Sequence, residues 1–151
     1  MQPNPYRILV TEDHDDTREL FVLVLQECHY EVVTSTSVFG TLDLANKQNF
    51  DLFLLDSRLS DGSGVDLCRS IRQFDKATPI LFCSGLAYEK DRQEALEAGA
   101  QSYLIKPVEF STLCQKVAEL IAGSPKSQGL IAKRRTAGTD SGDLPLVSVG
   151  A

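Results

Sequence analysis

The sequence predicts an α/β protein built on a doubly wound parallel sheet, and three observations support this fold class. Short runs of apolar and β-branched residues alternate five times with longer segments of helical spacing. The short runs are continuously apolar, as expected for parallel strands that are covered on both faces. Capping residues and glycines separate the two kinds of segment. These patterns predict five strand-helix units in one domain.

The five strands are predicted where the short apolar runs occur. They are Arg7–Thr11, Glu31–Ser35, Asp51–Leu55, Pro79–Cys83 and Gln101–Ile105. The helices are predicted near residues 16–28, 38–48, 64–74, 88–98 and 109–122. The last helix is the clearest, because its apolar residues recur every three or four positions and form one stripe.

The predicted helix ends rest on a few capping residues. Asp16 followed by Glu19 fits a capping box at the start of the first helix. Gly99 and Gly123 stand where the fourth and fifth helices should end.

Composition places the folded domain at residues 7–122, between a short N-terminal arm (1–6) and a flexible C-terminal tail (123–151). The tail is dominated by Gly, Ser, Thr and Pro and has no apolar period. No apolar stretch approaches the roughly 20 residues that span a bilayer, and the N-terminus lacks the features of a secretory signal. We therefore expect a soluble, cytoplasmic protein with no membrane partner.

The charge argues against a nucleic-acid-binding protein, and the cysteine spacing argues against a disulfide framework or a zinc site. The net charge is −6, which argues against nucleic acid as the main ligand. The four cysteines form no C-x-x-C pair, and we expect small buried side chains in a reduced compartment. They are Cys28, Cys68, Cys83 and Cys114.

Charged residues follow three of the predicted strands directly. Glu12 and Asp13 follow the first strand, Asp56 follows the third, and Lys106 with Pro107 follows the fifth. Because the carboxyl ends of parallel strands share one edge of a sheet, these side chains should converge. Taken singly, such an Asp is most often a cap and Lys-Pro a solvated loop. Their shared position favours one site.

The chemistry of these side chains is that of a metal and a phosphoryl group. Clustered carboxylates repel one another unless a cation lies among them, and oxygen ligands favour Mg²⁺ or Mn²⁺. Lys106 offers a positive charge, and Ser84, at the end of the fourth strand, offers a hydroxyl. We expect Pro107 to fix the backbone beyond the lysine. His14 is expected to be an exposed residue at the start of the first helix.

Four motifs, in this order and at these separations, resemble a receiver domain of a two-component response regulator. The resemblance runs from about Arg7 to Ile121. The motifs are Arg7–Asp13, Asp51–Asp56 with the segment leading to Gly64, Ile80–Gly85, and Ala98–Ala100 leading to Tyr103–Pro107. Each motif is weak alone, and the four together are specific.

The resemblance implies a role for each residue of the predicted site. Asp56 would accept the phosphoryl group, and Asp13, Asp56 and the backbone carbonyl of Arg58 would contact Mg²⁺. Glu12 would act through metal-bound water. Ser84 and Lys106 would hold the phosphoryl oxygens, and Tyr103 would turn inward as Ser84 moves. Packing at a strand edge is an equally good explanation of Tyr103.

The resemblance also implies a flavodoxin-like (βα)5 fold with strand order 2-1-3-4-5 and a stand-alone, single-domain response regulator. Its donor would be a sensor histidine kinase or a histidine phosphotransferase. Its output would be protein-protein contact on the face made by the fourth helix, fifth strand and fifth helix. Such a protein is not an enzyme beyond slow self-dephosphorylation. The sequence does not name the kinase, the target, the phosphate lifetime or the oligomeric state.

Two alternatives stay open from the sequence. Asp13-His14-Asp15-Asp16-Thr17 resembles the D-x-D-x-T motif of haloacid-dehalogenase-like phosphatases, with Asp13 as nucleophile. That motif leaves Asp56 unexplained, and its last acids would fall in the tail. The second alternative is a receiver-like scaffold that is not phosphorylated.

Overall fold

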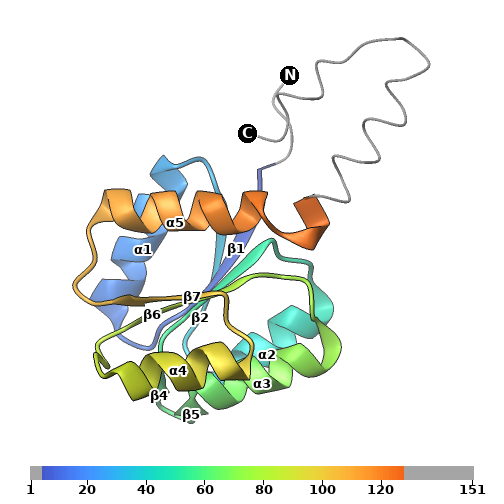
Figure 1. Cartoon of the computed structure of the whole chain (residues 1–151). Coiled ribbons are helices and arrows are strands. Elements are labelled where there is room, and N and C mark those ends of the chain that lie inside the picture. Colours follow the sequence, from blue (N-terminus) through green and yellow to red (C-terminus); the bar gives the residue numbers. More distant parts are fainter. Residues whose placement is uncertain (1–4, 128–151) are drawn as a thin grey trace.

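The computed structural model describes residues 5–127 and confirms the predicted fold class (Figure 1). Five strands pair in parallel into one sheet with the order β2-β1-β3-β6-β7, the predicted 2-1-3-4-5 arrangement. The strands are β1 (Arg7–Thr11), β2 (Glu31–Ser35), β3 (Leu52–Leu55), β6 (Ile80–Ser84) and β7 (Ser102–Ile105).

Five helices cover the two faces of this sheet, as Figure 1 shows. They are α1 (Asp15–Glu27), α2 (Val38–Lys47), α3 (Gly64–Phe74), α4 (Glu89–Ala98) and α5 (Phe110–Ala122). One buried cluster lies between the sheet and α1 and α5, and a second lies between the sheet and the other three helices. The sheet is therefore buried on both sides, which explains the continuously apolar strands.

The helix ends agree with the prediction at the C-terminal side and differ at the start of α1. Gly99 ends α4 in the left-handed conformation with a φ of 118°, and Gly123 ends α5. The predicted capping box at Asp16 is wrong, because α1 begins at Asp15 and its N-cap is His14. The His14 ring Nδ1 accepts a hydrogen bond from the backbone N–H of Thr17 at 3.4 Å. His14 is exposed, as expected.

A small hairpin between β3 and α3 was not predicted from the sequence. Its antiparallel strands are β4 (Arg58–Leu59) and β5 (Gly62–Ser63). Asp61, in the turn of this hairpin, accepts hydrogen bonds from the backbone N–H groups of Val38 at 2.8 Å and Phe39 at 3.1 Å. These bonds lower the pKa of Asp61 and connect the segment after β3 to the first turn of α2.

The ends of the described chain stay close to the domain. The carbonyl of Tyr6 accepts a hydrogen bond from the backbone N–H of Glu31 at 2.9 Å, and Lys126 Nζ donates to the carbonyl of Phe50 at 2.8 Å. The remainder of the predicted arm (1–4) and tail (128–151) lies outside the described residues. Within residues 5–127, no helix has the length and apolar character needed to cross a membrane.

Candidate functional site

Strand register brings the predicted site residues together at one edge of the sheet. Thr11, the last residue of β1, is paired with Leu55, the last residue of β3, so Glu12 and Asp56 emerge side by side. Ser84 at the end of β6 is paired with Ile105 at the end of β7. The residues that follow these strands therefore meet in one place, as expected for an open parallel sheet.

The three acidic residues form one cluster. Glu12, Asp13 and Asp56 each offer a carboxylate oxygen, and these oxygens lie within 4.8 Å of one another. Glu12 is buried at 1% exposure, whereas Asp13 is exposed and Asp56 is half-buried. Three oxygen donors at this separation fit a hard divalent cation such as Mg²⁺, which also takes water and phosphate oxygens. The donor set therefore satisfies the requirements of the predicted metal.

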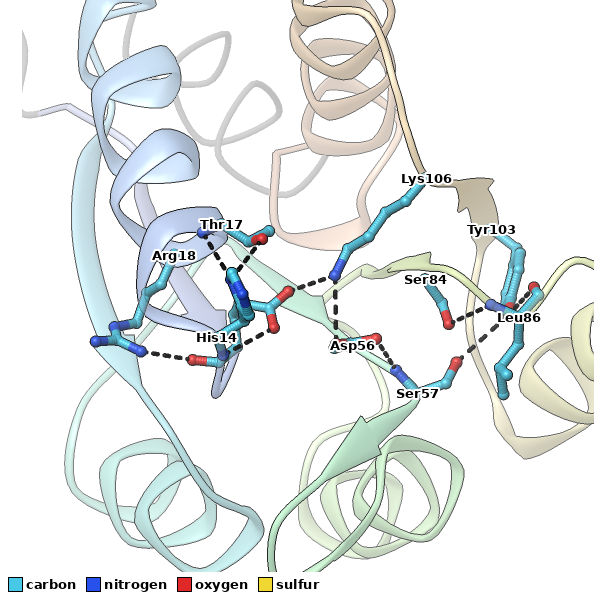
Figure 2. Close-up of polar contacts among 10 residues, drawn as sticks. His14, Thr17, Arg18, Asp56, Ser57, Ser84, Leu86, Tyr103 and Lys106 are labelled. Carbon is cyan, nitrogen blue, oxygen red and sulfur yellow. Dashed lines mark hydrogen bonds and ion pairs between the residues drawn. The ribbon is translucent and has the colours of Figure 1, made fainter.

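Lys106 lies across the cluster and contacts two of its acids (Figure 2). Its Nζ donates to Glu12 Oε1 at 2.6 Å and to Asp56 Oδ2 at 3.3 Å. Burial raises the pKa of Glu12, the Asp56 charge adds to this rise, and the hydrogen bond from Lys106 opposes it. Burial would lower the pKa of Lys106, but its bonds and charge interactions with the two acids raise it. Lys106 is therefore a fixed positive charge at neutral pH.

The backbone around Asp56 holds its carboxylate in place. The N–H of Ser57 donates to Asp56 Oδ1 at 2.7 Å. The N–H of Gly64 donates to the Ser57 carbonyl at 2.8 Å, which brings the start of α3 against the end of β3. A Cβ atom at residue 64 would lie 2.0 Å from the Asp56 carbonyl oxygen, so only glycine fits there. The close approach of Gly64 thus fixes the loop that carries Asp56.

Ser84 and Tyr103 are joined through the backbone of Leu86. Ser84 Oγ accepts from the Leu86 N–H at 3.1 Å, and the Tyr103 hydroxyl donates to the Leu86 carbonyl at 2.7 Å. Ser57 Oγ also lies 3.4 Å from the Tyr103 hydroxyl. The Tyr103 ring is buried and stacks on Phe82, with ring centroids 5.8 Å apart. Figure 2 shows this chain of contacts running from Asp56 toward Tyr103.

The other predicted site residues lie beside this cluster. The peptide bond between Lys106 and Pro107 is cis, and the Lys106 backbone N–H donates to the Ser84 carbonyl at 2.8 Å. Arg58 is the first residue of β4, two positions after Asp56. The use of its carbonyl as a metal ligand stays a prediction.

Sequence reasoning missed three residues of the site: Ser57, Gly64 as a steric requirement, and the backbone of Leu86. Ser57 and Gly64 act through their backbone N–H groups or through the absence of a side chain, which leaves no pattern of residue types to detect. A serine directly after a candidate acceptor was the one available signal for Ser57.

Comparison with known proteins agrees with this geometry. Residues 8–118 match the family model of the response regulator receiver domain. The nisin biosynthesis regulatory protein NisR of Lactococcus lactis is 35% identical over 112 residues, covering 74% of this chain and 48% of NisR. The chain thus spans about half the length of the curated relatives it matches.

Two solved structures are similar and were described with magnesium. The response regulator TrrA of Thermotoga maritima, in complex with Mg²⁺-BeF, is 32% identical with a TM-score of 0.70, and the match covers 76% of this chain and 98% of TrrA. The receiver domain of sensor histidine kinase PA1611 from Pseudomonas aeruginosa, with magnesium in its active-site cleft, is 26% identical. Its TM-score is 0.74, and the match covers 79% of this chain and 99% of that domain. The chain therefore belongs to the response regulator receiver domain family.

Proposed function

We propose that this protein is a phosphorylation-dependent switch that accepts a phosphoryl group on Asp56. One observation carries the proposal: the Asp56 carboxylate lies beside both the acid pair Glu12 and Asp13 and the Lys106 ammonium group. This arrangement offers a nucleophilic oxygen, a place for a divalent cation and a fixed positive charge within one small site. Phosphoryl transfer requires these three components.

The proposed reaction is transfer from a phosphohistidine of a histidine kinase or phosphotransferase. An Asp56 oxygen forms a bond to phosphorus, the phosphorus–nitrogen bond breaks, and the histidine leaves with its electron pair. The product is an acyl phosphate on Asp56. Bound Mg²⁺, held by Asp13, Asp56 and the Arg58 carbonyl with Glu12 acting through water, would offset negative charge on the phosphoryl oxygens. Mn²⁺ in this role stays a prediction from the sequence.

Lys106 is proposed to change partner when Asp56 is phosphorylated. Its Nζ lies closer to Glu12, at 2.6 Å, than to Asp56, at 3.3 Å. A phosphoryl group on Asp56 would add oxygens of higher charge on the Asp56 side. Because a charge-assisted hydrogen bond is stronger to the more highly charged acceptor, Lys106 would move toward the phosphoryl group.

The proposed switch runs through Leu86. To reach a phosphoryl oxygen, the Ser84 hydroxyl would give up its bond with the Leu86 N–H. The same residue's carbonyl holds the Tyr103 hydroxyl, so movement of this loop changes the environment of Tyr103. Phosphorylation would thereby shift the population of two arrangements of the face made by α4, β7 and α5. That face would present the output to another protein.

Several features of the whole protein remain proposals. We propose a signalling protein in the cytoplasm that acts as a phosphoryl acceptor and not as an enzyme with turnover. Family membership gives no support to the haloacid-dehalogenase-like phosphatase with Asp13 as nucleophile. A receiver-like scaffold without phosphorylation stays the competing possibility, and the next experiment separates the two.

The test is incubation with Mg²⁺ and acetyl phosphate, followed by intact-mass measurement. The wild type should gain one phosphoryl group, and Asp56→Asn should gain none. Asp43→Asn, an exposed carboxylate on α2, is the matched control and should be phosphorylated like the wild type. A wild type that gains no phosphate would favour the scaffold. Equal phosphate on Asp56→Asn would refute Asp56 as acceptor.

A further inference from the structure

Two of the four cysteines lie together on the face of the protein formed by α1 and α5. Cys28 is the C-terminal cap of α1, and Cys114 lies in α5. Both are half-buried, and they line one apolar groove between the helices together with Leu20, Leu23 and Phe110. The Cys28 thiol is close enough to Cys114 to raise the pKa of the Cys114 thiol. The predicted role as separate small hydrophobes does not account for this pairing.

We propose that Cys28 and Cys114 form a reversible, redox-sensitive disulfide that joins α1 to α5. A disulfide requires two sulfur atoms that can approach without large backbone movement, and Cys28 and Cys114 line the same groove from two adjacent helices, which places them for such an approach. It also requires access for an oxidant, which a half-buried pair in an open groove provides. Disulfides of this kind in reducing compartments are usually transient and regulatory.

The proposed oxidant is a hydroperoxide, and the reaction balances in two steps. The Cys28 sulfur attacks the peroxide, the oxygen–oxygen bond breaks, and a sulfenic acid and water or an alcohol are formed. The Cys114 sulfur then displaces the hydroxyl group, which leaves as water with the Cys114 proton, and the sulfur–sulfur bond forms. The two thiols lose two electrons and two protons in total.

The order of the two steps follows from the surroundings of Cys114. Burial raises the pKa of the Cys114 thiol to about 12, and the interaction with Cys28 adds to this effect. Cys114 is therefore protonated at neutral pH, and the first oxidation falls on Cys28.

The other two cysteines are natural controls. Cys68 and Cys83 are at most 1% exposed. Burial raises their thiol pKa values to about 11 and about 12, respectively. Cys68 lies on α3, on the opposite face of the sheet from α1 and α5, and Cys83 lies within β6. Neither has access to the oxidant or to the groove.

The disulfide would affect the two helices that follow the site. The chain enters α1 just after Glu12 and Asp13, and it enters α5 just after Lys106 and Pro107. A bond between Cys28 and Cys114 would fix these helices relative to each other. It would also restrict the unfolded chain, so the oxidised protein should melt at a higher temperature than the reduced protein.

The test is treatment of the folded, reduced protein with hydrogen peroxide, followed by intact-mass measurement and peptide mapping without reduction. The expected product is a monomer that has lost two hydrogen atoms, with one cross-linked peptide pair that contains Cys28 and Cys114. Dithiothreitol should reverse the change and lower the melting temperature again. Mapping of the wild type makes this test independent of whether any variant folds.

Single substitutions of the cysteines test which two form the bond. Cys28→Ser and Cys114→Ser should each lose the intramolecular bond, whereas Cys68→Ala and Cys83→Ala should retain it. The proposal is overturned if the folded wild type forms no disulfide, forms it between other cysteines, or forms only intermolecular dimers. It is also overturned if the bond persists in Cys114→Ser.

Discussion

The close approach of Gly64 to Asp56 predicts a large effect from the smallest possible substitution. In Gly64→Ala, the new Cβ would lie 2.0 Å from the Asp56 carbonyl oxygen and 3.0 Å from the carbonyl carbon. Cβ atoms essentially never come closer than 3.0 Å to such a heavy atom, so the new Cβ would be about 1 Å too close. Because the obstacle is backbone, no side-chain rotation relieves it.

The expected loss of unfolding free energy in Gly64→Ala is the cost of the steric overlap less the gain in helix propensity. Overpacking against an inflexible neighbour costs about 3 kcal/mol. Alanine is a better helix former than glycine and returns at most about 1 kcal/mol at the first residue of α3. We therefore expect the free energy of unfolding to fall by about 2 kcal/mol or more. The displaced Asp56 should also be phosphorylated more slowly, since its carboxylate is aligned by the same loop.

The assay is urea denaturation combined with the rate of phosphorylation by acetyl phosphate. Gly85→Ala is the matched control: it also lies beside the site, but its new Cβ would meet nothing within 4 Å. Gly85→Ala should be as stable as the wild type or more stable by up to about 1 kcal/mol. The reasoning is refuted if Gly64→Ala and Gly85→Ala unfold at the same urea concentration.

Three further predictions concern other contacts. Burial opposes ionisation of Asp75, but hydrogen bonds from Thr78 and its neighbours lower its pKa below the ordinary value of 3.8. Ionised Asp75 therefore contributes to the free energy of unfolding above pH 3.8, and this contribution is lost as the pH falls through the lower folded-state pKa. Asp75→Ala should lower the free energy of unfolding by about 1 kcal/mol at pH 7, allowing for partial exposure, and by less in acid; an equal loss at both pH values would contradict this. Tyr103→Phe removes the 2.7 Å bond to the Leu86 carbonyl and should cost about 1 kcal/mol in urea denaturation, whereas an unchanged midpoint would show that the bond contributes nothing. Glu12→Gln should weaken Mg²⁺ binding about tenfold in calorimetry, and wild-type affinity would exclude Glu12 from the metal site.

Most of the fold could be predicted because it depends on long, repeated patterns. Continuous apolar runs such as Leu52–Leu55 mark buried strands, and the stripe from Phe110 to Ile121 marks a helix. The hairpin of Arg58–Leu59 and Gly62–Ser63 escaped prediction because strands of two residues contain no period. The cap at His14 was missed because histidine is not a residue type that commonly caps helices.

In the candidate site too, some features could be predicted from the sequence and others could not. Glu12, Asp56 and Lys106 were expected to converge because each follows a strand, and the structure brings them together. That Lys106 is closer to Glu12 than to Asp56 depends on side-chain positions and could not be predicted. The shared groove of Cys28 and Cys114 depends on how α1 packs beside α5, for which the sequence contains no local signal.

The measurement that tests the central claim most directly is the location of the phosphoryl group. The protein is phosphorylated with acetyl phosphate and Mg²⁺, and borohydride then reduces the acyl phosphate to homoserine, which sequencing of peptides by mass spectrometry locates. Phosphorylation of Asp56 predicts homoserine at position 56 and nowhere else. Homoserine at position 13, or phosphate without any homoserine, would contradict the account.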